Sequence, residues 1–110
     1  MKKTQLIDSS SDFWLSWVST EISEGRLTDL VIPEYVRIIG PRAFADCKNL
    51  VSVTFHSNLT AIGDEAFANC TALKSIEIPE TLKILGNAPF IGCTSLSSVT
   101  IPGRFLEDFP

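Results

Sequence analysis

The chain has 110 residues, of which 45% are hydrophobic and 20% are charged. This composition is normal for one globular domain and argues against a disordered chain. The formal net charge of −4 argues against binding to a nucleic-acid backbone, which requires clustered lysine and arginine, and suits a protein partner with a basic surface.

Residues 1–10 are mostly polar or charged, so we predict a flexible N-terminus there and no signal peptide. No stretch of the sequence is apolar over the length of a membrane span. We therefore expect a cytoplasmic protein that contacts no membrane, or a surface or secreted one if a leader has been removed.

Residues 11–26 predict an amphipathic helix that caps the structure after it. Its apolar residues recur at spacings of three and four and so share one face; they are Phe13, Trp14, Trp17, Val18 and Ile22. Gly25 stands where a helix commonly ends. The two tryptophans either cover the next segment of the chain or are exposed anchors for a partner, a role in which tryptophan is enriched.

Residues 27–105 repeat with a period of 23. Cys47, Cys70 and Cys93 are each 23 residues apart. The same interval separates other sets of identical residues: Phe44, Phe67 and Phe90; Gly40, Gly63 and Gly86; Leu27, Leu50, Leu73 and Leu96. These columns predict a stack of about 3.5 coils with one shared core, because a single coil cannot bury its own apolar face.

Each unit predicts a strand on one side of the coil and a helical or 3₁₀ turn on the other. In the third unit Ile76 and Ile78 alternate with polar residues, which indicates a short strand with these two side chains inward. Pro79 ends the strand because proline cannot donate to a sheet ladder. Leu82 and Ile84 follow as a second inward pair. The repeated glycine then predicts a tight turn into a helical segment that ends at the cysteine.

The carboxyl end begins a further coil and leaves it unfinished. Phe105 falls in the column of Leu59 and Leu82, so the fourth coil starts in register. Residues 106–110 depart from the pattern, and we predict a C-terminal tail there. Either Leu106 and Phe109 fold back over the end of the stack, or two chains meet at this coil as a homodimer.

The repeated motif Ile-Gly-x-x-Ala-Phe-x-x-Cys-x-x-Leu-x-x-Ile-x-Ile-Pro resembles the BspA-like class of leucine-rich repeats over roughly residues 27 to 105. The resemblance implies an α/β repeat fold, a short right-handed leucine-rich-repeat solenoid with a parallel sheet on its concave side. Members of this class usually serve adhesion or partner binding and are not enzymes. We therefore expect a non-catalytic protein-binding module.

The sequence predicts no metal, cofactor or catalytic site. The three cysteines form no Cys-x-x-Cys pair and, at one repeat apart, run in a file along the stack without converging on an ion. Their odd number fits reduced thiols, which behave as small buried apolar residues. His56 is the only histidine, and it replaces the proline that ends the other strands, so we expect a surface contact and not a general base.

The outward positions of the predicted strands form the candidate partner-binding surface. Most are small hydroxyl side chains with a few acids, and no aromatic ring is present to stack on a glycan, so a protein partner is favoured. The predicted contact residues are Asp29, Val31, Ser52, Thr54, His56, Lys74, Ser75, Glu77, Ser98 and Thr100. The alternative is that small polar residues simply suit an exposed parallel sheet.

The ends and one flank of the stack form a second candidate surface. Its residues are Trp14, Trp17, Glu21, Glu24, Asp64, Glu65, Leu106 and Phe109. The acids among them predict a negative flank, and a small acidic protein could occupy the basic groove of a nucleic-acid-binding enzyme and inhibit it, as a phage anti-defence protein would. A further alternative, which the resemblance implies, is a fragment of a bacterial surface adhesin.

Overall fold

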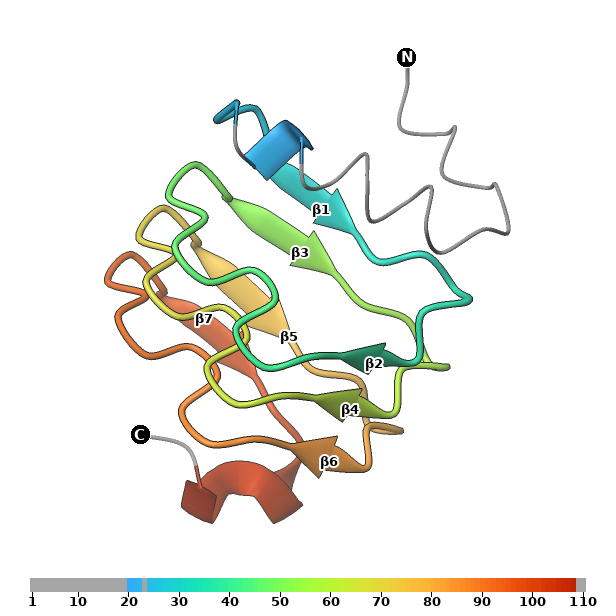
Figure 1. Ribbon diagram of the computed structural model, residues 1–110. Helices are drawn as coiled ribbons and strands as arrows, with labels where there is room; N and C mark the ends of the chain where they lie inside the picture. Colours follow the sequence, from blue (N-terminus) through green and yellow to red (C-terminus); the bar gives the residue numbers. More distant parts are fainter. Residues whose placement is uncertain (1–19, 23, 109–110) are drawn as a thin grey trace.

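The computed structural model describes residues 20–22 and 24–108, with side chains described as far as residue 105. Two parallel sheets form two sides of a stack of coils (Figure 1). The four-stranded sheet consists of β1 (Asp29–Val31), β3 (Ser52–Thr54), β5 (Ser75–Glu77) and β7 (Ser98–Thr100). The three-stranded sheet consists of β2 (Ile38–Ile39), β4 (Ala61–Ile62) and β6 (Ile84–Leu85). The 3₁₀ helix η2 (Gly103–Asp108) follows β7.

The register of both sheets equals the period of the sequence. In the four-stranded sheet Ser75 lies beside Ser52 in β3 and beside Ser98 in β7. In the three-stranded sheet Ala61 lies beside Ile38 in β2. Each of these pairs is 23 residues apart, and the rest of the unit supplies the long connection that parallel neighbours require. The predicted parallel pairing of equivalent strands is confirmed.

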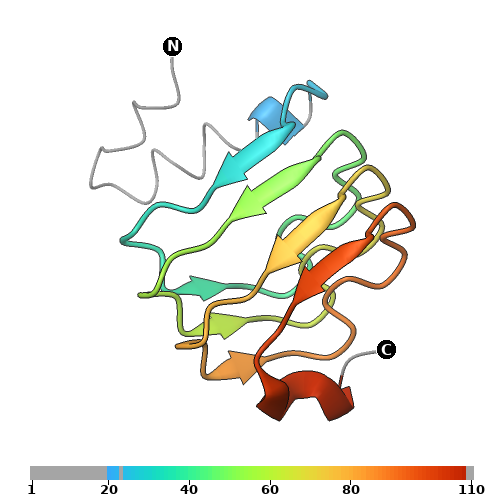
Figure 2. The same cartoon turned by 180° about the vertical axis from the view of Figure 1, so that it is seen from behind.

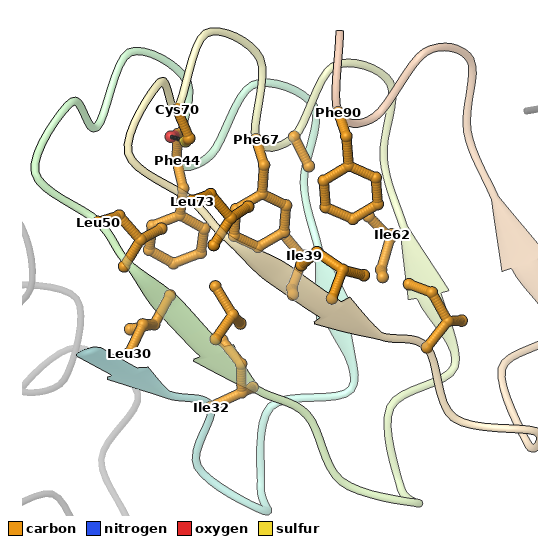
Figure 3. Close-up of a cluster of buried hydrophobic side chains, with 14 of the residues drawn as sticks. Leu30, Ile32, Ile39, Phe44, Leu50, Ile62, Phe67, Cys70, Leu73 and Phe90 are labelled. Atoms are coloured by element: carbon orange, nitrogen blue, oxygen red, sulfur yellow. Dashed lines mark hydrogen bonds between the residues drawn. The ribbon is translucent and has the colours of Figure 1, made fainter. Parts of the chain in front are cut away.

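The core lies between the two sheets and is built from columns of equivalent residues (Figure 3). The Phe67 ring is fully buried and lies between the rings of Phe44 and Phe90. Its centroid is 5.3 Å from the first and 5.5 Å from the second, with interplanar angles of 15° and 16°. Leu50 and Leu73 are also fully buried. Each repeated residue therefore packs on its own equivalents, which makes the core continuous from coil to coil.

The side chain of Ile84 does not point inward as predicted. It is 63% exposed, whereas Leu85 packs against the core, as the buried Ile39 and Ile62 do in the same column. Successive side chains of a strand point to opposite faces, so a two-residue strand buries only one of them. The residue next to the glycine is the inward one.

The segments after the repeated glycine are turns and not the predicted helical segments. In the first coil the amide N–H groups of Phe44 and Asp46 donate to the carbonyl oxygens of Ala66 and Ala68 in the next coil, at 2.8 and 2.7 Å. A helix would use these amides for bonds within its own segment. Arg42 and Asp46 also have φ angles of 53° and 65°, a left-handed conformation that interrupts any helix.

Most of the predicted N-terminal helix lies outside the described residues. Its described part is helical at residues 20–22. Gly25 follows with a φ of 73°. Its amide donates to the Ile22 carbonyl at 3.1 Å, and the Arg26 amide donates to the Glu21 carbonyl at 2.9 Å, which is the Schellman pattern of a helix end. Ile22 packs against the core, so this helix end lies on the first coil.

At the other end, the fourth coil starts in register and then continues into η2. Phe105 is buried in the core, as predicted from its column. Arg104 reaches back to the third coil, where its guanidinium donates to the carbonyl oxygens of Glu80, at 2.8 Å, and Leu82. η2 lies beyond β6 at the end of the stack (Figure 1). The predicted tail over residues 106–110 thus begins inside this 3₁₀ helix.

The repeated glycine begins the predicted tight turn and also allows neighbouring coils to touch. The amide of Ala43 donates to the Gly40 carbonyl at 3.2 Å, and that of Ala66 donates to the Gly63 carbonyl at 3.3 Å. None of Gly40, Gly63 and Gly86 has a left-handed φ. A Cβ added at Gly63 would lie 2.6 Å from the backbone nitrogen of Pro41, and one at Gly86 would lie 2.5 Å from that of Asp64. Nothing lies within 4 Å of a Cβ at Gly40, in the first coil. Glycine is therefore required where a coil packs on the one before it.

The three cysteines are free thiols whose side chains interact along the stack. The Cys70 thiol donates to the carbonyl oxygen of Phe44 at 3.2 Å, and the Cys93 thiol donates to that of Phe67 at 3.2 Å. A hydrogen bond with the side chain of Cys47, together with burial, raises the pKa of Cys70 to about 12. The same bond lowers the pKa of Cys47. Cys70 is thus a buried, protonated thiol at neutral pH.

We expect Gly63→Ala to lower the free energy of unfolding by about 1–3 kcal/mol, the usual cost of overpacking, because the new methyl group would displace the Pro41 backbone. Gly40→Ala is the matched control at the same position of the repeat and should change stability by less than about 0.5 kcal/mol. Urea unfolding of both variants measures the difference. Equal losses in the two variants would contradict this explanation of the repeated glycine.

We also expect stability to fall at alkaline pH through Cys70. The folded state holds this proton more tightly than the unfolded state, so the stabilisation is complete below the ordinary thiol pKa of 9.0 and is lost as pH rises from there toward about 12. Because its hydrogen bond with Cys47 lowers the pKa of that thiol, the loss should be smaller than about 1.4 kcal/mol per pH unit, the value for an isolated group. Urea unfolding in a reducing buffer measures the free energy of unfolding across this pH range for the wild type and for Cys70→Ala. The other groups that ionise in this range are present in both proteins, so the difference reports on Cys70. Parallel pH profiles would show that Cys70 contributes nothing.

Candidate protein-binding surface

Eight of the ten predicted contact residues belong to the strands of the four-stranded sheet, which faces the viewer in Figure 2. They form two columns that follow the strand register: Asp29, Ser52, Ser75 and Ser98, then Val31, Thr54, Glu77 and Thr100. All are exposed except Ser52, which is half-buried. Lys74 is exposed beside the first column. The result is a mostly polar face on which Val31 is the exposed apolar member of the two columns.

The two acids on this face have different surroundings. The Ser52 hydroxyl donates to Oδ1 of Asp29 at 2.6 Å, and the Thr28 hydroxyl donates to Oδ2 at 3.4 Å, so this carboxylate is held within the surface. Glu77 lies in the second column and is exposed, and it forms no ion pair with any described residue. Glu77 is therefore the acid on this face that is available to a cation from outside.

A shallow cavity of about 400 Å³ opens where β3 and β5 end. Its lining combines hydroxyl, carboxylate and apolar groups from three coils: Val53, Thr54, Phe55, His56, Ser57, Glu77, Ile78, Pro79, Glu80 and Thr100. Four predicted contact residues therefore line this cavity: Thr54, His56, Glu77 and Thr100. Glu80 also lines it, and sequence analysis missed this residue although it directly follows the proline that ends the strand.

His56 joins two coils through both of its ring nitrogens. Nε2 lies 2.8 Å from the carbonyl oxygen of Pro33, and the amide of Asn58 donates to Nδ1 at 3.0 Å. Because Nδ1 accepts a hydrogen bond, the ring proton belongs on Nε2, which donates to Pro33. The ring is half-buried, and both of its nitrogens form hydrogen bonds with backbone groups, so it is a fixed part of the cavity wall. No carboxylate partner for a proton relay contacts it among the described residues.

Two arginines offset part of the charge of the predicted acidic flank. Glu21 and Glu24 both pair with Arg26, with nitrogen–oxygen distances of 3.0 Å. Glu65 pairs with Arg42 in the neighbouring coil. Oδ1 of Asp64 accepts a hydrogen bond from the amide of Asn87 at 2.8 Å. Arg26 and Arg42 therefore offset two of the four negative charges of Glu21, Glu24, Asp64 and Glu65, and the hydrogen bond to Asp64 leaves its charge in place.

The remaining residues predicted at the ends of the stack are not placed on any surface. Trp14, Trp17 and Phe109 lie outside the described residues, and so does the side chain of Leu106. Within residues 20–22 and 24–108, no three His, Cys, Asp or Glu side chains gather closely enough to hold a metal ion. The helical segments in the same ranges lack the length and apolar character of a membrane span.

Comparisons with known proteins agree with this architecture. The chain is similar to a solved structure of a leucine rich cell surface protein from Faecalibacterium prausnitzii A2-165, with 32% sequence identity and a TM-score of 0.65. The similarity covers 73% of this chain and 21% of that one, so the chain spans about a fifth of the length of this relative. No curated protein matches the chain.

Residues 22–108 match the family model described as BspA type Leucine rich repeat region (6 copies). The match covers well over half of the 110 residues and includes all seven described strands. It agrees with the resemblance carried by the glycine, phenylalanine and cysteine columns, which is confirmed. The chain belongs to the BspA-type leucine-rich repeat family.

Proposed function

We propose that this chain is a non-catalytic protein-binding module that uses the outer face of the four-stranded sheet. The observation that carries the proposal is the pair of exposed, in-register columns beside a cavity of about 400 Å³. The strands under these columns are fixed by parallel pairing and by the buried side chains between them, such as Leu30 and Ile76. A surface that is ordered before binding loses little conformational entropy when a partner docks.

We infer a right-handed winding of the coils, because parallel strands joined by a crossover are almost always connected in that hand. The family resemblance implies a parallel sheet on the concave side of such a solenoid, and we assign the four-stranded sheet to that side. A concave polar platform suits a folded protein partner whose surface is convex and rich in hydrogen-bonding groups.

The chemistry of the face favours a partner with a basic contact residue. Serine and threonine hydroxyls can donate and accept hydrogen bonds, while Glu77 and Glu80 contribute negative charge at the cavity. A lysine or arginine side chain entering there would meet both carboxylates. No aromatic ring stands in either exposed column, which favours protein over glycan.

A role at the cell surface is favoured by one comparison. The similar structure belongs to a leucine rich cell surface protein, and this chain corresponds to about a fifth of it. We propose that the repeats act as part of an adhesin-like surface. Antibodies against the folded chain should label intact cells that produce it, and labelling only after lysis would contradict a surface location.

We expect Thr54→Arg to abolish partner capture because it adds bulk and positive charge in the middle of the face. Asn87→Arg is the matched control, with the same added charge at an exposed residue that follows the three-stranded sheet. Proteins photo-crosslinked to the wild type would be quantified by mass spectrometry for both variants. A specific partner should fall at least about tenfold with Thr54→Arg and stay unchanged with Asn87→Arg. Equal capture by all three proteins would rule out this face.

A further inference from the structure

The outer face of the three-stranded sheet carries large apolar side chains that contribute nothing to the core. Ile38 is 66% exposed and Ile84 is 63% exposed, the two highest values among the exposed large hydrophobic residues of the described chain. The strand register places Ala61 between them. Ile38, Ala61 and Ile84 therefore form one outward column, termed here the isoleucine column. The three-stranded sheet that carries it lies on the opposite side of the molecule from the four-stranded sheet (Figures 1 and 2).

Folding does not require isoleucine at these positions. The inward residues of the same strands, Ile39 and Ile62, are buried and complete the core without them. On the four-stranded sheet the corresponding outward positions hold serine, threonine and acids with the one exception of Val31, which shows that the repeat accepts polar residues on an outer face. Aligned apolar side chains left in water are typical of a contact surface.

Unpaired cations flank the isoleucine column. Arg37 directly precedes Ile38, and Lys83 directly precedes Ile84. Both are exposed, and neither forms an ion pair with another described residue, in contrast to Arg26 and Arg42. Positive charge beside an apolar column is complementary to a partner that is both apolar and acidic.

The spacing of these residues matches an α-helix lying along the stack. Ile38 and Ile84 are two strand spacings apart, about 10 Å. Seven residues of helix rise by about the same distance and return to the same face. Ala61 is smaller than its two neighbours in the column, so a leucine of the middle turn could pack between Ile38 and Ile84. Acids one heptad apart on the helix would then reach Arg37 and Lys83.

We propose that the outer face of the three-stranded sheet docks an acidic amphipathic helix of a partner protein. Apolar side chains of the helix cover Ile38 and Ile84, its middle leucine packs against Ala61 between them, and its carboxylates pair with Arg37 and Lys83. This surface is separate from the one in the proposed function and does not depend on it.

The test uses a stapled helical peptide with leucines on one face over two turns and glutamates one heptad apart. We expect fluorescence anisotropy to detect binding to the full chain, and NMR shifts to map to β2, β4 and β6. Ile38→Ser/Ile84→Ser should weaken binding at least about tenfold. Arg37→Glu/Lys83→Glu should weaken binding of the acidic peptide. The same variant should bind a peptide that carries lysines in place of the glutamates.

Ile91→Ser is the matched control, because Ile91 is 49% exposed in a turn outside both sheets and its substitution should leave peptide binding unchanged. Circular dichroism checks that all variants fold, which is expected since every substituted side chain is exposed. Absence of binding at millimolar peptide overturns the proposal. So does self-association of the chain that Ile38→Ser/Ile84→Ser dissolves, which would make a second copy the occupant. Binding to anionic vesicles that competes with the peptide would assign the face to lipid instead.

Discussion

The backbone hydrogen bond from each coil to the next is the interaction on which the rest of this structure depends. It runs through strands and turns alike: the Phe44 amide reaches the Ala66 carbonyl at 2.8 Å, and the Phe67 amide reaches the Pro89 carbonyl at the same distance. Residues 23 apart are thereby held about one strand spacing from each other. Every residue type in the repeat must accept its own equivalent as a neighbour. Stacked phenylalanine rings, a file of thiols and a glycine with no room for Cβ all satisfy that requirement.

Where a unit departs from the repeat, a side chain restores contact with the preceding coil. His56 stands in place of the strand-ending proline, and its ring bonds to the Pro33 carbonyl. Asn69 donates to the Asp46 carboxylate at 3.1 Å, within a column of left-handed residues. Arg104 binds two carbonyl groups of the third coil before the chain enters η2. Variation in sequence is therefore tolerated as long as the polar groups of one coil find partners in the next.

The period of the sequence predicted which residues share a column, and hence the strand register and the buried file of phenylalanines. It did not predict the turns, because an Ala-Phe-Ala segment has helical propensity and only the neighbouring coil decides where its amides donate. Ile84 was predicted inward from its apolar character, whereas strand alternation places it outward. The cavity was not predicted either, because Glu80, Thr54 and Thr100 line one cavity only when three coils stack.

The same constraint explains why the two outer faces can differ so strongly in chemistry. The residue type at an inward position is restricted because its side chain must pack on the equivalent residue of the next coil. The backbone hydrogen bonds between coils form with any side chain. Outward side chains are limited only by their neighbours in the column, so hydroxyls and Glu77 can occupy one face while Ile38 and Ile84 occupy the other. The core lies between the faces, so an occupant of one leaves the other accessible. The two proposed surfaces therefore share no residue, and a substitution on one leaves the chemistry of the other unchanged.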